Sequence, residues 1–129
     1  MLRVAIYARD APGHYGRTRL HRQVAVLATH VARQPGWHHV ATYGDLDLGP
    51  AAVRPVLARL QAEAPGRIDV VVVDGYGRLS TDCHELGVLL AHLQAVGVQT
   101  VVLRPSGGRR LARLVANLAL ADVIGTAAR

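Results

Sequence analysis

Residues 68–73, with the sequence IDVVVV, carry the clearest β-strand signal in the chain. β-Branched residues favour strands, and a short apolar run without polar alternation is typical of a strand buried on both faces. Such strands lie in parallel sheets that helices cover from both sides. The stretch therefore predicts an α/β fold with a parallel sheet.

Weaker strand signals and amphipathic segments alternate on either side of this stretch. The further predicted strands are residues 2–8, 37–43 and 98–103. The predicted helices are residues 18–34, 51–64, 82–96 and 109–124, with Thr18 and Asp82 as candidate N-caps of the first and third. Four β-then-α units predict an open, mainly parallel sheet of four or five strands with helices on both faces.

The size and composition of the chain suit one compact unit. Its 129 residues are enough for one hydrophobic core, and half of them are hydrophobic. Phe is absent, so the core must be built from Val, Leu, Ile and Ala. We find no internal repeat or linker, and we expect residues 1–129 to form a single domain without a separate DNA-binding domain.

The chain is basic, with a formal net charge of +6, and all 15 basic residues are Arg. A GC-rich coding bias accounts for this composition as readily as a phosphate-binding surface does, and the two explanations are compatible. Arg forms bidentate phosphate contacts that Lys cannot form. Nucleic acid is therefore a candidate partner, although the charge names no target sequence.

Cysteine usage and hydropathy bear on the cellular compartment. Cys83 is the only cysteine, so no internal disulfide can form, as suits a reducing cytoplasm. The apolar run at residues 2–8 is too short for a signal peptide, and no stretch is long enough to span a bilayer. We therefore expect a cytoplasmic chain without a membrane partner.

Residues 82–85 (Asp-Cys-His-Glu) combine side chains that can ligate metals. At adjacent positions on one helix these side chains point in different directions. We therefore expect neither a metal nor another cofactor.

Ligands of parallel α/β sheets bind outside the carboxyl ends of the strands. The loops that follow the predicted strands are residues 9–17, 43–50, 74–82 and 104–108. Three arginines from separate segments, Arg9, Arg54 and Arg78, are predicted to converge at this edge. The alternative is three independent solvated arginines, and the local sequence around each favours convergence.

Four short blocks surround these arginines in chain order. They are Tyr7-Ala8-Arg9 with Gln23 in the following helix, Arg54-Pro55, residues 69–80, and Gly108-Arg109 at the start of the last helix. In this order and spacing they resemble the N-terminal catalytic domain of serine recombinases of the resolvase/invertase family, over essentially the whole chain. The resemblance implies a resolvase-like fold and a relation to site-specific DNA recombination.

The resemblance also implies a site. In the family, a serine after the first strand attacks a DNA phosphodiester, and arginines neutralise the charge of the transition state. The matching positions Tyr7, Arg9, Gln23, Arg54 and Arg78 are then the remnant of a phosphate site.

The departures from the family pattern fall in the same blocks. Ala11 stands where the family has its nucleophilic serine, Gly77 replaces an Asp, and Thr81 replaces an Arg. Alanine has no nucleophilic atom, so the resemblance implies a catalytically inactive domain, a pseudoenzyme. Three losses in one site are typical of a decayed or repurposed enzyme rather than of a single substitution made to trap a complex.

Other residues are weak replacements for the missing serine. Thr18 is assigned to helix capping, Ser80 and Thr81 sit across the site, and Asp10 points the other way if the strand alternation continues. Two alternatives stay open: an active recombinase or nuclease with another nucleophile, and a small α/β module that binds a phosphorylated ligand.

The last predicted helix has an apolar stripe that needs a partner. The stripe consists of Leu111, Leu114, Val115 and Leu118. By resemblance it is a truncated form of the long helix that builds the family's dimer. Packing on its own sheet and forming a homodimer interface are compatible, and we expect a dimer that binds DNA weakly and without sequence preference.

Overall fold

The computed structural model describes residues 1–47, 49–50 and 53–104. The strands in this part are β1 (Leu2–Asp10), β2 (Trp37–Leu46), β3 (Val70–Val73) and β4 (Gln99–Val102). Its helices are α1 (Gly16–Ala32), α2 (Pro55–Glu63), α3 (Tyr76–Leu79) and α4 (Cys83–Ala95). The predicted helix 109–124 with its apolar stripe, the block Gly108-Arg109 and the predicted loop at 105–108 lie outside the described residues.

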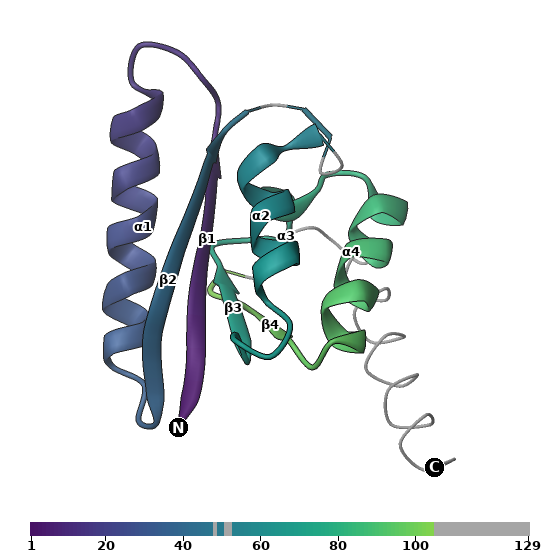
Figure 1. Ribbon diagram of the computed structural model, residues 1–129. Coiled ribbons are helices and arrows are strands. Elements are labelled where there is room, and N and C mark those ends of the chain that lie inside the picture. The colour runs from purple at the N-terminus through teal and green to yellow at the C-terminus, as the bar shows by residue number, and fades with distance from the viewer. Residues whose placement is uncertain (48, 51–52, 105–129) are drawn as a thin grey trace.

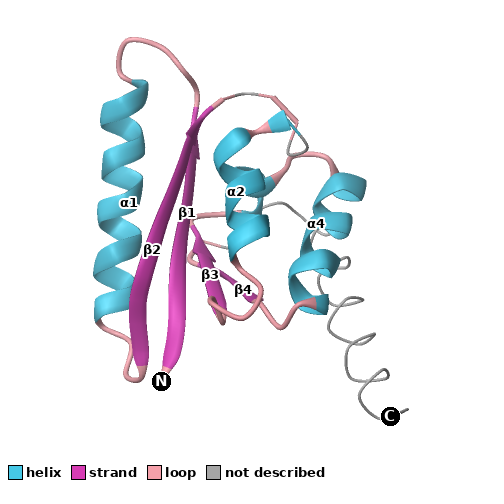
Figure 2. Ribbon diagram, in the orientation of Figure 1, coloured by secondary structure: helices cyan, strands magenta, loops and turns pink. Residues whose placement is uncertain are grey.

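The strands form one sheet in the order β2-β1-β3-β4, and every neighbouring pair is parallel. Helix α1 covers one face, while α2 and α4 lie on the other (Figures 1 and 2). The predicted fold class is confirmed: an open parallel α/β sheet with helices on both faces. All carboxyl ends of the strands therefore meet at one edge.

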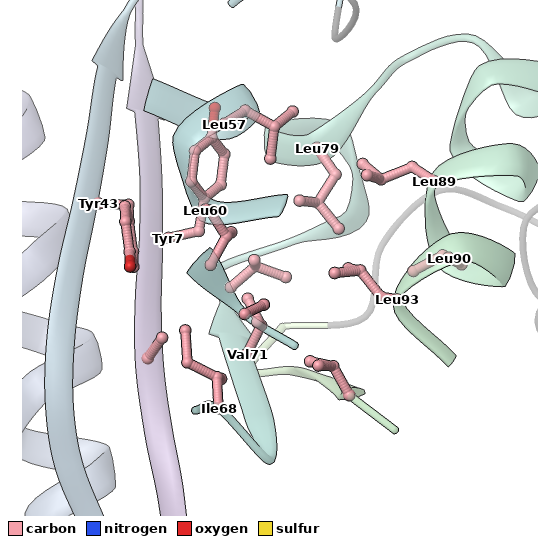
Figure 3. Close-up of a cluster of buried hydrophobic side chains, with 14 of the residues drawn as sticks. Tyr7, Tyr43, Leu57, Leu60, Ile68, Val71, Leu79, Leu89, Leu90 and Leu93 are labelled. Atoms are coloured by element: carbon pink, nitrogen blue, oxygen red, sulfur yellow. The ribbon is translucent and has the colours of Figure 1, made fainter. Parts of the chain in front are cut away.

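Burial of the valine run explains why β3 lies inside the sheet. All four residues of β3 are at most 1% exposed. Val71 and Val73 pack with Tyr7 on the side of α2 and α4 (Figure 3), whereas Val70 and Val72 pack with the α1 side. The strand is buried on both faces, as its sequence predicts, and each buried valine contributes about 1.5–3 kcal/mol.

Two helix starts differ from the prediction. Helix α1 begins at Gly16 with Tyr15 at its N-cap, so Thr18 is not the cap. A Cβ at position 16 would overlap the carbonyl oxygen of Ala11, and this close approach places the helix start at the glycine. Helix α2 begins at Pro55 rather than at 51, because Arg54 before the proline is extended.

Other boundaries agree or extend the prediction. Asp82 is the N-cap of α4, and its carboxylate accepts a hydrogen bond of 2.9 Å from the Glu85 amide, as predicted. Strands β1 and β2 run past residues 8 and 43 because they stay paired to Asp10 and Leu46. No helix in the described part of the chain is both long and apolar enough to cross a lipid bilayer.

The opposite, amino-terminal edge of the sheet is tied by Arg3 and Asp69. The Asp69 carboxylate accepts from the Arg3 guanidinium at 3.0 Å twice and from the Arg3 backbone amide at 2.7 Å. These hydrogen bonds lower the pKa of Asp69 to about 2. The contact links the start of β1 to the residue before β3.

We expect Asp69→Asn to lower the free energy of unfolding at neutral pH, because the amide cannot replace the ionised acceptor. Because the pKa of Asp69 is lower in the folded chain, its contact with Arg3 stabilises the fold fully above pH 3.8, the ordinary pKa. This contribution is lost as the pH falls through about 2. The difference between wild type and variant should therefore be constant near neutrality and shrink below pH 3.8. Urea denaturation across this pH range measures it, and a pH-independent difference would contradict the assignment.

Candidate functional site

A pocket of about 600 Å³ opens at the carboxyl edge of the sheet. Its lining comes from the ends of β1, β3 and β4, from α3 and from the turn that follows α3. The lining residues are Arg9, Asp10, Ala11, Asp74, Gly75, Gly77, Arg78, Thr81 and Arg104. Three arginines face two aspartates, so the wall carries a net positive charge suited to an anion.

Arg9 is held rigidly on the pocket wall. Its backbone amide donates to Gln23 Oε1 at 2.9 Å, and Gln23 Nε2 donates back to the Arg9 carbonyl at 3.0 Å. Its guanidinium donates to the backbone carbonyls of Asp47, at 2.7 Å, and Gly77, at 3.2 Å. Burial lowers the pKa of Arg9, and the neighbouring Arg54 guanidinium lowers it further. Gln23 thus positions Arg9 from α1 and does not line this pocket.

Arg78 projects from α3 to the same wall. Its Nη1 donates to the Arg9 carbonyl at 2.9 Å. The guanidinium also lies 3.7 Å from Asp10 Oδ2 and 3.6 Å from Asp74 Oδ2. The side chain is 36% exposed, so Arg78 reaches both the protein and the solvent of the pocket.

Arg54 does not join Arg9 and Arg78 in lining the pocket. It is 1% exposed and donates to the backbone carbonyls of Gly49, at 3.1 Å, Arg78, at 2.7 Å, and Leu79. It also donates to the Tyr7 hydroxyl at 3.0 Å. The predicted convergence therefore brings Arg9 and Arg78 together, while Arg54 braces the backbone behind them.

Tyr7 and Asp45 complete a buried chain with Arg54. The Tyr7 hydroxyl donates to Asp45 Oδ2 at 2.8 Å, and burial raises the pKa of Tyr7 well above its ordinary value. The Asp45 carboxylate also accepts from the amides of Val56 and Leu57 in the first turn of α2, at 3.0 and 2.9 Å. The sequence prediction noted Asp45 ahead of the Arg54-Pro55 block but did not count it among the site residues, although an acidic residue at a strand end before a helix is a recognisable signal.

The three positions that depart from the family pattern line one pocket. Ala11, Gly77 and Thr81 share its wall with Arg9 and Arg78. A Cβ at Gly77 would meet nothing closer than Thr81 Cγ2 at 4.0 Å, so the fold accommodates a larger residue there. Leu48, which stands where the family's second block usually has Ser, lies outside the described residues.

The prediction that Asp10 points away from the site is wrong, because Asp10 lines the pocket beside Ala11. Strand β1 ends at Asp10, and its carboxylate turns to accept from the Ala11 amide at 2.8 Å and from Arg19 at 2.9 Å. Burial acts to raise the pKa of Asp10, but these hydrogen bonds hold it below its ordinary value.

Asp74 and Arg104 are the other pocket residues that sequence reasoning missed. Arg104 Nε and Nη2 donate to the two oxygens of Asp74 at 2.9 and 2.8 Å. Asp74 directly follows the buried strand β3, and Arg104 lies two residues after the end of β4. This position at the carboxyl ends of the strands is the signal that could have found them. Within residues 1–47, 49–50 and 53–104, no three His, Cys, Asp or Glu side chains gather as a metal site requires.

Comparison with known proteins adds the family. The model of the family "Resolvase, N terminal domain" matches residues 4–126. The chain belongs to this family. It is a serine-recombinase-like domain of the kind involved in site-specific DNA recombination, and the resemblance predicted from the four blocks is confirmed. No curated protein matches the chain.

Solved structures share the fold. The catalytic domain of ISC1926 TnpA, an IS607-like serine recombinase, is 24% identical over 91% of this chain and 79% of its own, with a TM-score of 0.72. The catalytic domain of TP901-1 integrase is 23% identical over 95% and 98%, with a TM-score of 0.70. A resolvase family site-specific recombinase from Streptococcus pneumoniae is 14% identical over 98% and 93%, with a TM-score of 0.68.

We expect Arg54→Met to destabilise the fold by about 3 kcal/mol or more, because it leaves buried carbonyl oxygens without donors. Arg17→Met is the matched control, since Arg17 is exposed on α1 and should change stability by less than about 0.5 kcal/mol. Chemical denaturation of both variants measures the difference. Equal stabilities would mean that Arg54 is not the brace that its contacts indicate.

Proposed function

We propose that this chain is a catalytically inactive serine-recombinase-like domain that binds the DNA backbone through its pocket and associates with a second copy of itself. In this proposal residues 1–129 act as a single domain in the cytoplasm. Binding is weak and without sequence preference, because in this proposal the pocket arginines contact backbone phosphates, which carry no sequence information.

The observation that carries the proposal is the position of Ala11. It lies on the wall shared by Arg9 and Arg78, where a phosphodiester would meet both guanidinium groups. A methyl group cannot attack phosphorus, and charge stabilisation by arginine cannot replace a nucleophile. The pocket therefore retains groups suited to holding a phosphate and lacks the group at this position that would cleave it.

One observation favours a second candidate, an active nuclease or recombinase that uses Thr81. The Thr81 side chain lines the same pocket as Ala11, Arg9 and Arg78. Ser80 is a weaker replacement, because the residue is only 2% exposed and its hydroxyl donates to Glu85 at 2.8 Å. Replacing Thr81 with Val separates the two candidates.

We expect the wild-type chain to leave supercoiled plasmid intact and to form no covalent adduct with DNA, with or without divalent cations. The combined substitution Ala11→Ser, Gly77→Asp and Thr81→Arg restores the family residues at the three pocket positions and should produce a detectable adduct. Denaturing gel electrophoresis with labelled DNA measures both. Wild-type cleavage that disappears in Thr81→Val would establish the second candidate.

We expect Arg78→Gln to weaken binding to a labelled DNA duplex about three- to tenfold and to reduce its salt dependence by about one counterion, because one phosphate contact is lost. Arg17→Gln is the control that removes the same charge from the exposed surface of α1. Fluorescence anisotropy over a salt series measures both effects. Equal losses in the two variants would indicate non-specific attraction and reject the pocket as the DNA site.

The predicted helix 109–124 supports the proposed dimer through its apolar stripe of Leu111, Leu114, Val115 and Leu118. We expect light scattering to give twice the mass of one chain and Leu118→Asp to halve it, because a charge in the stripe opposes burial. Asn117→Asp adds the same charge outside the stripe and should leave the mass unchanged. A wild-type monomer would contradict the dimer and leave DNA binding as a separate question.

A further inference from the structure

The arginines around the pocket already have anionic partners within the protein. Asp10 ends β1 and Asp74 directly follows β3, and these two parallel strands are neighbours in the sheet. Their carboxylates consequently lie at the same edge, on either side of Arg78, at 3.7 and 3.6 Å from its guanidinium nitrogens. The side chains of Asp10 and Asp74 are only 14% and 9% exposed.

Two further arginines donate hydrogen bonds to the same carboxylates. Arg19 donates to Asp10 at 2.9 Å from α1, and Arg104 binds both oxygens of Asp74 from the end of β4. A guanidinium binds carboxylate and phosphate with the same paired N–H groups. The carboxylates of Asp10 and Asp74 therefore occupy donors that a backbone phosphate would use.

The two carboxylates line more than the main pocket. A second hollow of about 260 Å³ is lined by Arg19, Arg22, Gln23 and Val26. It shares Asp10, Asp74, Arg78 and Arg104 with the main pocket. Asp10 and Asp74 thus line both hollows, whose arginines could contact neighbouring phosphates of one strand.

The strengths of these contacts make an exchange feasible. Arg78 lies beyond hydrogen-bonding distance from both carboxylates, and its guanidinium donates instead to the Arg9 carbonyl. Arg104 is 73% exposed, and ion pairs in that environment are weak. An incoming phosphate can therefore take over guanidinium groups that the aspartates hold in the free protein.

We propose that Asp10 and Asp74 act as internal competitors of phosphate, holding Arg19, Arg78 and Arg104 in ion pairs and thereby setting a low affinity of the pocket for backbone phosphodiesters. This inference rests on the proposed binding of DNA at the pocket. It assigns to the two aspartates a role in specificity: an extended polyanion that reaches several arginines at once displaces them, whereas a single inorganic phosphate does so poorly.

The test compares Asp10→Asn with Asp69→Asn in the full chain. Each substitution removes one negative charge and keeps the shape of the side chain, but Asp69 is bound to Arg3 at the opposite edge of the sheet. We expect Asp10→Asn to tighten binding to a labelled DNA duplex about five- to tenfold and to steepen its salt dependence, with less than a twofold change for Asp69→Asn. Inorganic phosphate is then added as a competitor to each protein, with the protein at the concentration that half-saturates the labelled DNA. It should displace DNA from Asp10→Asn at a lower phosphate concentration than from wild type.

Three results would overturn the inference, and only the third would also reject the proposed binding of DNA at the pocket. Unchanged affinity in Asp10→Asn, while Arg78→Gln still weakens binding, removes the competitor role and leaves DNA binding at the pocket intact. Equal gains in Asp10→Asn and Asp69→Asn assign the effect to net charge. If Arg78→Gln leaves the DNA affinity unchanged, the pocket is not the DNA site, and both proposals are rejected. Asp74→Asn repeats the measurement, and thermal melting verifies that each variant is folded.

Discussion

The buried chain Asp45–Tyr7–Arg54 is the constraint on which the rest of the site depends. Arg54 is buried, so its guanidinium must donate to acceptors within the protein. These acceptors are the Gly49 carbonyl, the two carbonyls at the end of α3 and the Tyr7 hydroxyl. Asp45 accepts from Tyr7 and from the first turn of α2. One polar network thus fixes β1, β2, α2 and α3 relative to one another, and α3 is the element that carries Arg78.

The arginines of the site look alike in the sequence but differ in what their guanidinium groups contact. Arg54 is structural, because its donors all meet acceptors inside the protein. Arg9 is intermediate, anchored by two carbonyls yet lining the pocket, and Arg78 and Arg104 face solvent to a greater degree. Two backbone carbonyls, which do not titrate, hold the Arg9 guanidinium on the pocket wall.

The three described positions that depart from the family pattern lie on the wall of the pocket, outside the buried chain. Ala11, Gly77 and Thr81 line the pocket but take no part in the buried chain, so changing them leaves the scaffold intact. The residues that hold the fold together are therefore different from the residues at the three changed positions of the pocket. In the proposed function the pocket keeps the arginines of a phosphate site although position 11 lacks a hydroxyl, and Asp10 and Asp74 give these arginines an internal partner.

The sequence by itself determined the fold class, the valine strand buried on both faces and the edge at which the site lies, because strand periodicity and β–α alternation are local signals. It also determined that position 11 lacks a hydroxyl. Only the tertiary structure decided that Arg54 braces the backbone while Arg9 and Arg78 line the pocket, and that Asp10 turns toward them. Those outcomes depend on which acceptors three segments bring within reach after folding, and no spacing along the chain encodes such distances.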